Sequence, residues 1–215
     1  MAGRTSLAPY RGLLLDFAGV LTEEVLGVHR TWCVEQGLEP HAWRSTLNDH
    51  QEGRVLYADL EVGRISQAEW NERTGPLLGV SDSVNLMGRA WAGVRASVAM
   101  IGLARAARSA GLVVGLLSNS FGLDPYDPYR EMGVWDLFDV HVVSELEGVA
   151  KPDPAIYELA LHRMGLAAGE VVFVDDHERN LPPAEELGMT AILGDGSRQT
   201  AQRVAGLLQL EIVAV

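Results

Sequence analysis

The sequence predicts an α/β protein with a Rossmann-like, doubly wound parallel sheet, and two observations support this fold class. Short apolar runs alternate with helical patterns along most of the chain, and these runs are apolar at nearly every position. Alternating strands and helices are typical of βαβ units, and fully apolar strands are typical of a sheet buried on both faces. The expected strands are Leu13–Leu15, Leu112–Leu117, Val171–Val174 and Thr190–Leu193, with a weaker one at Val140–Val143.

Helices are expected between the later strands. Val98–Ala110 has apolar residues at helical spacing and stops before a glycine. Pro154–Met164 has proline in its first turn and also stops before a glycine, both of which favour a helix with these ends. Two further helices are expected at Asn180–Leu187 and Ser197–Leu208.

The segment from roughly Thr22 to Arg95 differs from the rest, because it shows amphipathic helical patterns and no convincing strand. Residues 66–69 (Ser-Gln-Ala-Glu) form a capping-box pattern that opens one of these helices. We therefore expect residues 22–95 to be a small helical domain inserted after the first strand, and residues 1–21 and 96–215 to be the sheet domain. Cys33 and four of the five tryptophans lie in the insert, where we expect them to be buried.

Composition excludes several classes of function. The chain has 215 residues, with 17 Lys+Arg against 29 Asp+Glu and a net charge of −12. Such acidity argues against nucleic acid and anionic lipid as partners. A single cysteine excludes an intramolecular disulfide and a cysteine-based zinc cluster. The apolar run Leu13–Leu15 ends at Asp16, and no run approaches the roughly 20 residues that span a bilayer. We expect a cytoplasmic monomer or homodimer without nucleic-acid or membrane partners.

Polar side chains follow successive strands of the predicted sheet. The carboxyl ends of parallel strands meet at one edge, so these side chains should lie close together. Each alone has an ordinary explanation as a turn residue or a helix start, but their repetition after successive strands argues against coincidence. An ordered loop at residues 124–129 is expected nearby. The residues, in chain order, are Asp16, Ser118, Asn119, Lys151, Asp175 and Asp176.

This set of side chains is suited to phosphoryl transfer. Three clustered carboxylates repel one another, and Mg²⁺, which binds carboxylates together with phosphate oxygens, relieves that repulsion. Asp16 is then a competent nucleophile toward phosphorus. Lys151 would supply positive charge, and Ser118 and the amides near Gly19 would donate to phosphate oxygens.

The chain resembles the haloacid dehalogenase superfamily over nearly its whole length. Leu13–Leu21 is similar to the first motif of that family, and the second, third and fourth are matched by Ser118, Lys151 and the pair Asp175 and Asp176. The insert is similar to the family's small helical cap. The stretch from residue 173 to 193 is similar to a subgroup that holds the N-terminal phosphatase domain of epoxide hydrolases and bacterial sugar-phosphate phosphatases.

The resemblance implies a Mg²⁺-dependent phosphatase that acts on a small phosphorylated metabolite through an aspartyl-phosphate on Asp16. Asp16, Ser118 and Lys151 would be catalytic. Gly19, Ser118, Asn119 and Lys151 would bind substrate. The implied metal ligands are Asp16, the carbonyl of Ala18, Asp175 and Asp176.

One position departs from the family pattern. Phosphatases of the family usually carry an aspartate two residues after the nucleophile, where this chain has Ala18, and that aspartate protonates the leaving oxygen. General acid–base catalysis contributes about 10²–10⁴ in rate, so turnover is expected to be slow. Glu23, Glu24 and His29 are candidate replacements, although two glutamates here also fit a solvated first helical turn. His177 and Arg179 follow the fourth motif and are expected at the surface.

Three other activities tolerate a missing acid at this position. Phosphonoacetaldehyde hydrolases use a cap lysine, and the insert contains none, because the chain's only lysine is Lys151. Metal-independent 2-haloacid dehalogenases need no proton donor, but their fourth motif typically lacks the paired acids found at Asp175 and Asp176. A non-catalytic phospho-ligand binding protein is the third alternative.

Overall fold

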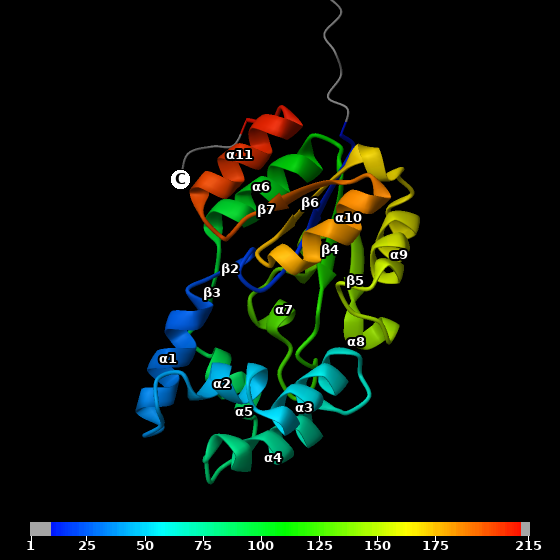
Figure 1. The fold of residues 1–215 in the computed structure, drawn as a ribbon. Coiled ribbons are helices and arrows are strands. Elements are labelled where there is room, and N and C mark those ends of the chain that lie inside the picture. The colour runs from blue at the N-terminus through cyan, green and yellow to red at the C-terminus, as the bar shows by residue number, and fades with distance from the viewer. Residues whose placement is uncertain (1–9, 212–215) are drawn as a thin grey trace, which may run out of the picture.

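The computed structural model describes residues 10–211 and contains a parallel five-stranded sheet in the order β5-β4-β1-β6-β7. This confirms the predicted α/β fold with a doubly wound parallel sheet (Figure 1). β1 is central, and the chain adds β4 and β5 on one side before it crosses to the other. The strands are β1 (Gly12–Leu15), β4 (Val113–Ser118), β5 (Val140–Val143), β6 (Val171–Asp175) and β7 (Thr190–Leu193).

Helices cover both faces of the sheet. In β1, Leu13 and Leu15 join the apolar cluster under α6 and α11, whereas Leu14 joins the cluster under α9 and α10. Alternate side chains of a strand point to opposite faces, so a strand that is apolar throughout is buried on both sides. The covering helices are α6 (Val98–Ser109), α11 (Arg198–Leu208), α9 (Pro154–Met164) and α10 (Leu181–Leu187).

Five further helices lie together beyond the carboxyl ends of the strands, and we call them the cap helices (Figure 1). Their four tryptophans and Cys33 are buried, which confirms the expectation for the insert. Ser66 accepts a hydrogen bond from the Glu69 amide at 3.1 Å, but the Glu69 side chain pairs with Arg73, so half of the predicted capping box forms. The cap helices are α1 (Val25–Glu35), α2 (Ala42–Asn48), α3 (Gln51–Glu61), α4 (Gln67–Leu78) and α5 (Leu86–Trp91).

The expectation that this segment lacks strands is wrong at its two ends. β2 (Thr22–Glu23) pairs antiparallel with β3 (Arg95–Ala96), and this ribbon connects the cap helices to the sheet. Strands of two residues are too short to show a sequence pattern. Glu23 therefore lies in a strand, and Glu24 precedes α1 in a left-handed conformation, so neither occupies the first helical turn as expected.

The cap helices are also fastened to the core away from this ribbon. The buried Gln67 side chain donates to the carbonyls of Phe121 and Tyr126 and accepts from the Tyr126 amide. Trp91 stacks on Phe121 with a centroid distance of 4.3 Å. These contacts hold the cap over the carboxyl edge of the sheet. Shorter elements complete the core: α7 (Pro128–Glu131), α8 (Ser144–Glu147), η1 (Trp135–Leu137), η2 (Ala168–Glu170) and η3 (Glu178–Asn180).

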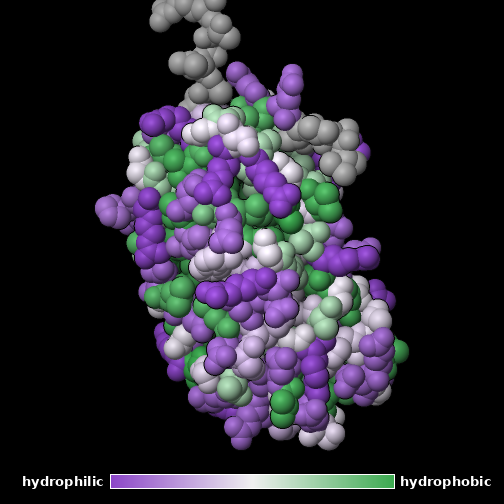
Figure 2. Space-filling model, turned by 180° about the vertical axis from the view of Figure 1, so that it is seen from behind, coloured by the Kyte–Doolittle hydropathy of each residue, from purple (hydrophilic) through white to green (hydrophobic). Residues whose placement is uncertain are grey.

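The face shown in Figure 2 is mostly hydrophilic, with small and separate hydrophobic patches. Among the described residues, no helix is both long enough and apolar enough to cross a membrane.

Candidate active site

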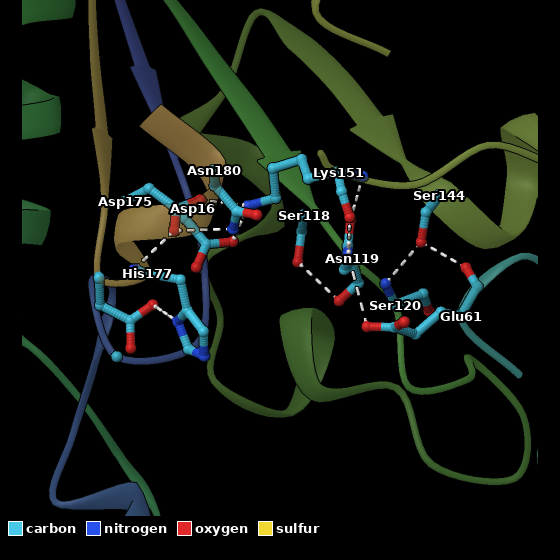
Figure 3. Close-up of polar contacts among 12 residues, drawn as sticks. Asp16, Glu61, Ser118, Asn119, Ser120, Ser144, Lys151, Asp175, His177 and Asn180 are labelled. Carbon is cyan, nitrogen blue, oxygen red and sulfur yellow. Dashed lines mark hydrogen bonds and ion pairs between the residues drawn. The ribbon is translucent and has the colours of Figure 1, made fainter. Parts of the chain in front are cut away.

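A buried network joins three of the predicted residues at the carboxyl edge of the sheet. The Lys151 Nζ lies 2.7 Å from Asp16 Oδ1 and 2.6 Å from Asp175 Oδ2 (Figure 3). Asp16 follows β1, Asp175 ends the adjacent β6, and Lys151 comes from the loop after α8. Lys151 is 4% exposed and Asp175 is fully buried. Burial alone would lower the pKa of Lys151, but Asp16 and Asp175 raise it, so the ammonium stays charged.

Asp175 fixes the position of Lys151. Its Oδ1 accepts hydrogen bonds from the His177 amide and from Asn180 Nδ2, both at 2.9 Å, while Oδ2 accepts from Lys151. Both oxygens thus already have donors from the chain. Asp175 stays a predicted metal ligand, and in the structure it also holds the lysine beside Asp16.

Asp176 approaches the loop after β1 very closely. A Cβ on Gly19 would lie 2.3 Å from Asp176 Oδ2, and Gly19 has φ of +83°, so this position requires glycine for both reasons. The other oxygen, Asp176 Oδ1, lies 2.6 Å from His177 Nδ1. The Gly19 amide donates to Thr22 Oγ1 at 2.8 Å, and its role in binding phosphate stays a prediction.

The residues present fit a hard divalent cation. Asp16 and Asp175 flank the Lys151 ammonium, and Asp176 lies close enough to raise the pKa of Asp16, so the acids outnumber the lysine at the site. Burial, followed by Asp175 and Asp176, raises the pKa of Asp16 to about 7 despite the attraction of Lys151. Carboxylate and carbonyl oxygens are the ligands that Mg²⁺ prefers. The groups predicted to hold it are Asp16, the Ala18 carbonyl, Asp175 and Asp176, and the structure places Asp175 and Asp176 with His177 in one group of possible ligands.

Ser118 and Asn119 end β4 beside this network. The Ser118 hydroxyl accepts a hydrogen bond from Tyr129 Oη at 3.0 Å. Asn119 uses both atoms of its amide on the Lys151 backbone, accepting from the nitrogen at 2.8 Å and donating to the carbonyl at 3.0 Å. Asn119, predicted to bind substrate, therefore holds the loop that carries the lysine.

The site contains residues that sequence reasoning missed. Tyr129 belongs to the 124–129 tract, which was expected near the site without a role. Asn180 lies in the stretch of residues 173–193 that resembles the phosphatase subgroup, and that resemblance was the signal that could have identified it. Glu61, at the end of α3, touches Asn119 from the cap, and no motif marks it.

A cavity of about 220 Å³ lies between the core and the cap helices, and Asp16, Ala18 and Lys151 line it from the core side. A wider cavity of about 820 Å³ forms its mouth. The two share lining residues from both sides, including Leu26, Arg44 and Arg179, so they are continuous. His177 and Arg179 are exposed at this mouth, as expected.

The three predicted replacement acids are not equivalent. Glu23 and Glu24 are exposed and line the mouth rather than the inner cavity. His29 lines the inner cavity, where its ring packs against Trp43 and Trp91. Burial lowers its pKa to about 4, so the imidazole is neutral at pH 7 and is a poor acid there.

The buried His29 predicts a pH dependence of stability. Between pH 6.5 and 4 the unfolded chain binds a proton that folded His29 does not, so stability falls as the pH is lowered through this range. The shift from 6.5 to about 4 corresponds to about 3 kcal/mol. Urea unfolding of wild type and His29→Gln at several pH values measures this effect. The difference between the two proteins should change by about that amount, and a constant difference would contradict the burial of a neutral imidazole.

Relatives of the chain support the interpretation of the site as that of a hydrolase. It is 32% identical over 139 residues to the sesquiterpene phosphatase astK of Aspergillus oryzae, covering 63% of this chain and 70% of that protein. It is 31% identical over 86 residues to the glyceraldehyde 3-phosphate phosphatase of Methanocaldococcus jannaschii, covering 40% of this chain and 38% of that protein. For several curated relatives, the match spans less than half of their length.

A solved structure with the same architecture is the HAD family enzyme of Bacteroides thetaiotaomicron in complex with magnesium and inorganic phosphate. It is 25% identical, has a TM-score of 0.65, and the match covers 87% of this chain and 96% of that chain. The model of the haloacid dehalogenase-like hydrolases matches residues 10–188, which is most of the chain. The chain therefore belongs to the haloacid dehalogenase-like hydrolases, a family of enzymes.

Proposed function

We propose that the chain is a Mg²⁺-dependent phosphatase that hydrolyses a small phosphate monoester through a phosphoryl group carried on Asp16. The observation that supports this most is the buried network in which Lys151 lies between Asp16 and Asp175, with Asp176 alongside. The similarity to two phosphatases and to an enzyme that binds magnesium and inorganic phosphate points the same way.

Each residue of the site has its own role in the proposed reaction. Asp16 attacks phosphorus with the carboxylate oxygen that faces the cavity. Lys151 offsets the charge of the transferring phosphoryl group and is fixed for this task by Asp175. The Ser118 hydroxyl accepts from Tyr129 and donates its own proton in a long hydrogen bond of 3.3 Å to the Asn119 carbonyl, and we propose that this proton turns to a phosphate oxygen when substrate binds. Bound Mg²⁺ supplies further positive charge, which lets an anionic nucleophile approach an anionic phosphate.

The cap helices shape the space for the rest of the substrate. The inner cavity has aromatic and aliphatic walls from the cap, among them Trp43, Leu47 and Trp91, while Arg44 and Arg179 lie toward the mouth. We propose that the phosphate sits on Asp16 and that the leaving group extends past these walls toward the mouth. A small phosphorylated metabolite fits this arrangement, and closure by the cap keeps bulk water from the reacting atoms.

Metal removal tests the proposal. Purified protein should release phosphate from an activated aryl phosphate in the presence of Mg²⁺, and EDTA should reduce the rate to the uncatalysed background. Excess Mg²⁺ should restore it. Phosphate release that persists in EDTA would contradict the assignment, and chloride release from a 2-haloacid in EDTA would show a dehalogenase instead. No turnover, with a phosphosugar raising the melting temperature, would show a binding protein.

A further inference from the structure

Because Ala18 cannot donate a proton, the proton donor has to come from another residue that lines the inner cavity. Among the residues that line this 220 Å³ space, Asp16 and Glu61 carry carboxyl groups. Asp16 is the nucleophile of the proposed function. Glu61 comes from the opposite side, from the last residue of α3 in the cap, and it shares the cavity with Ala18 and Lys151.

The contacts of Glu61 hold its backbone and leave its carboxyl group nearly free. The Ser144 hydroxyl donates to the Glu61 carbonyl, which ties the end of α3 to the core. The carboxyl group itself accepts one long hydrogen bond, from Asn119 Nδ2 at 3.3 Å, and Asn119 is already engaged with the Lys151 backbone. Figure 3 shows Glu61 next to Asn119, with Ser118 between this pair and Asp16.

The surroundings of Glu61 favour its protonated form. Burial raises the pKa of the Glu61 carboxyl, and this outweighs the hydrogen bond from Asn119 and the charges of Arg179, Lys151 and His177, which lower it. The neighbouring Tyr57 is not a competitor, because burial and Glu61 raise the pKa of its hydroxyl. A carboxylic acid with a raised pKa that lines the same cavity as the nucleophilic carboxylate is suited to general acid–base catalysis.

We propose that Glu61 is the catalytic acid and base of this enzyme, supplied by the cap in place of the aspartate that Ala18 replaces. The proposal rests on the proposed phosphatase function. As Asp16 Oδ bonds to phosphorus and the bond from phosphorus to the leaving oxygen breaks, the Glu61 carboxyl gives its proton to that oxygen, which departs as an alcohol. Glu61 is then a carboxylate. A water molecule attacks phosphorus, Glu61 takes one of its protons, and the bond to Asp16 breaks to release phosphate.

This role requires the cap to be closed, because α3 carries the acid. The Gln67 contacts to Phe121 and Tyr126 and the Ser144 contact to Glu61 hold the cap in this position. Substrate binding and proton transfer therefore both depend on the closed position of the cap. The other cap carboxylates, Glu23 and Glu24, line the mouth and are exposed to water.

The test compares two substrates that differ in their need for an acid. An alkyl phosphate must be protonated as it leaves, whereas an activated aryl phosphate leaves as a stable phenolate. In Glu61→Gln, kcat/KM for the alkyl phosphate, which reports transfer of the phosphoryl group to Asp16, should fall by about 10²–10⁴, and kcat/KM for the aryl phosphate should fall far less. The value of kcat should fall for both substrates, because they share the hydrolysis step in which Glu61 is the base. Glu145→Gln is a matched control, because Glu145 is also partly buried, has a raised pKa and bonds the nearby Ser120 without lining the cavity.

A second variant separates proton transfer from a structural role. Ala18→Asp supplies an acid at the usual family position, so adding it to Glu61→Gln should restore much of the alkyl phosphate rate. In wild type, kcat should fall at high pH because the acid loses its proton. This fall should be absent in Glu61→Gln. An equal fall in kcat/KM for both substrates, without rescue by Ala18→Asp, would overturn the role of Glu61. Absence of turnover in wild type would instead refute the proposed function.

Discussion

Asp16→Asn should lower kcat for any phosphate monoester by at least about 10⁴, because the amide oxygen is not a nucleophile toward phosphorus. Asparagine has nearly the same shape, and its oxygen can still accept the hydrogen bond that Lys151 donates to Asp16 Oδ1 at 2.7 Å. The variant should therefore fold and retain affinity for phosphate. Its kcat is measured with an activated aryl phosphate, so that the missing acid at Ala18 does not limit the comparison.

The melting temperature of Asp16→Asn, measured with and without phosphate and Mg²⁺, is the control for folding and binding. A folded variant that still turns over within about tenfold of wild type would contradict the assignment of Asp16 as the nucleophile.

Lys151→Met should destabilise the fold by about 3–5 kcal/mol and remove activity, since it leaves two buried carboxylates without their cation. Asp16 and Asp175 are both buried, and each lies within 2.7 Å of the Lys151 Nζ. Lys151→Arg should be nearly as harmful to activity, because a wide planar guanidinium does not replace a compact ammonium between two closely spaced acids. Urea unfolding in EDTA measures the change in stability.

Arg11→Met provides the contrast for the lysine variants. The Arg11 side chain is 67% exposed and pairs with Glu170 at 3.1 Å, so its removal should cost less than about 1 kcal/mol. If Lys151→Met were destabilised no more than Arg11→Met, the expected contribution of the buried ion pairs to the free energy of unfolding would be contradicted.

The buried network gives the position of the chain's only lysine a functional interpretation. The chain has 17 basic residues, and Lys151 is its only lysine. That lysine is 4% exposed and lies between two carboxylates, at the one position where the proposed chemistry needs a compact ammonium. Part of the net charge of −12, which first argued only against nucleic acid, is thus located in the site.

The strands could be predicted closely because burial on both faces demands uninterrupted apolar residues, as in Leu13–Leu15 and Val171–Val174. Parallel register then brings Asp16 next to Asp175, since Leu15 pairs with Val174. The ribbon at residues 22–23 and 95–96 was missed for the opposite reason. Each of these strands has only two residues and pairs with the other through its backbone, so neither produces a side-chain pattern in the sequence.

The parts of the site that sequence reasoning missed depend on packing between distant segments. Asn119 stays a predicted substrate-binding residue, and the hydrogen bonds by which its amide holds the Lys151 loop could not be predicted, because they depend on how two loops fold together. Tyr129 donates a hydrogen bond to Ser118, and Asn119 donates one to Glu61. In each pair the two residues come from different segments of the chain. Asp175 shows the same limit, because the sequence identified the pair of acids but could not show that Asp175 contacts Lys151.

Capture of the phosphorylated enzyme tests the central claim most directly. Wild-type protein mixed with Mg²⁺ and an activated aryl phosphate, then quenched in acid within one turnover, should carry one added phosphoryl group. Mass spectrometry of its peptides should place that group on Asp16, and Asp16→Asn treated in the same way should carry none. Phosphate release by wild type with no phosphoryl group on Asp16 at any quench time, or with the group on another residue, would contradict the mechanism.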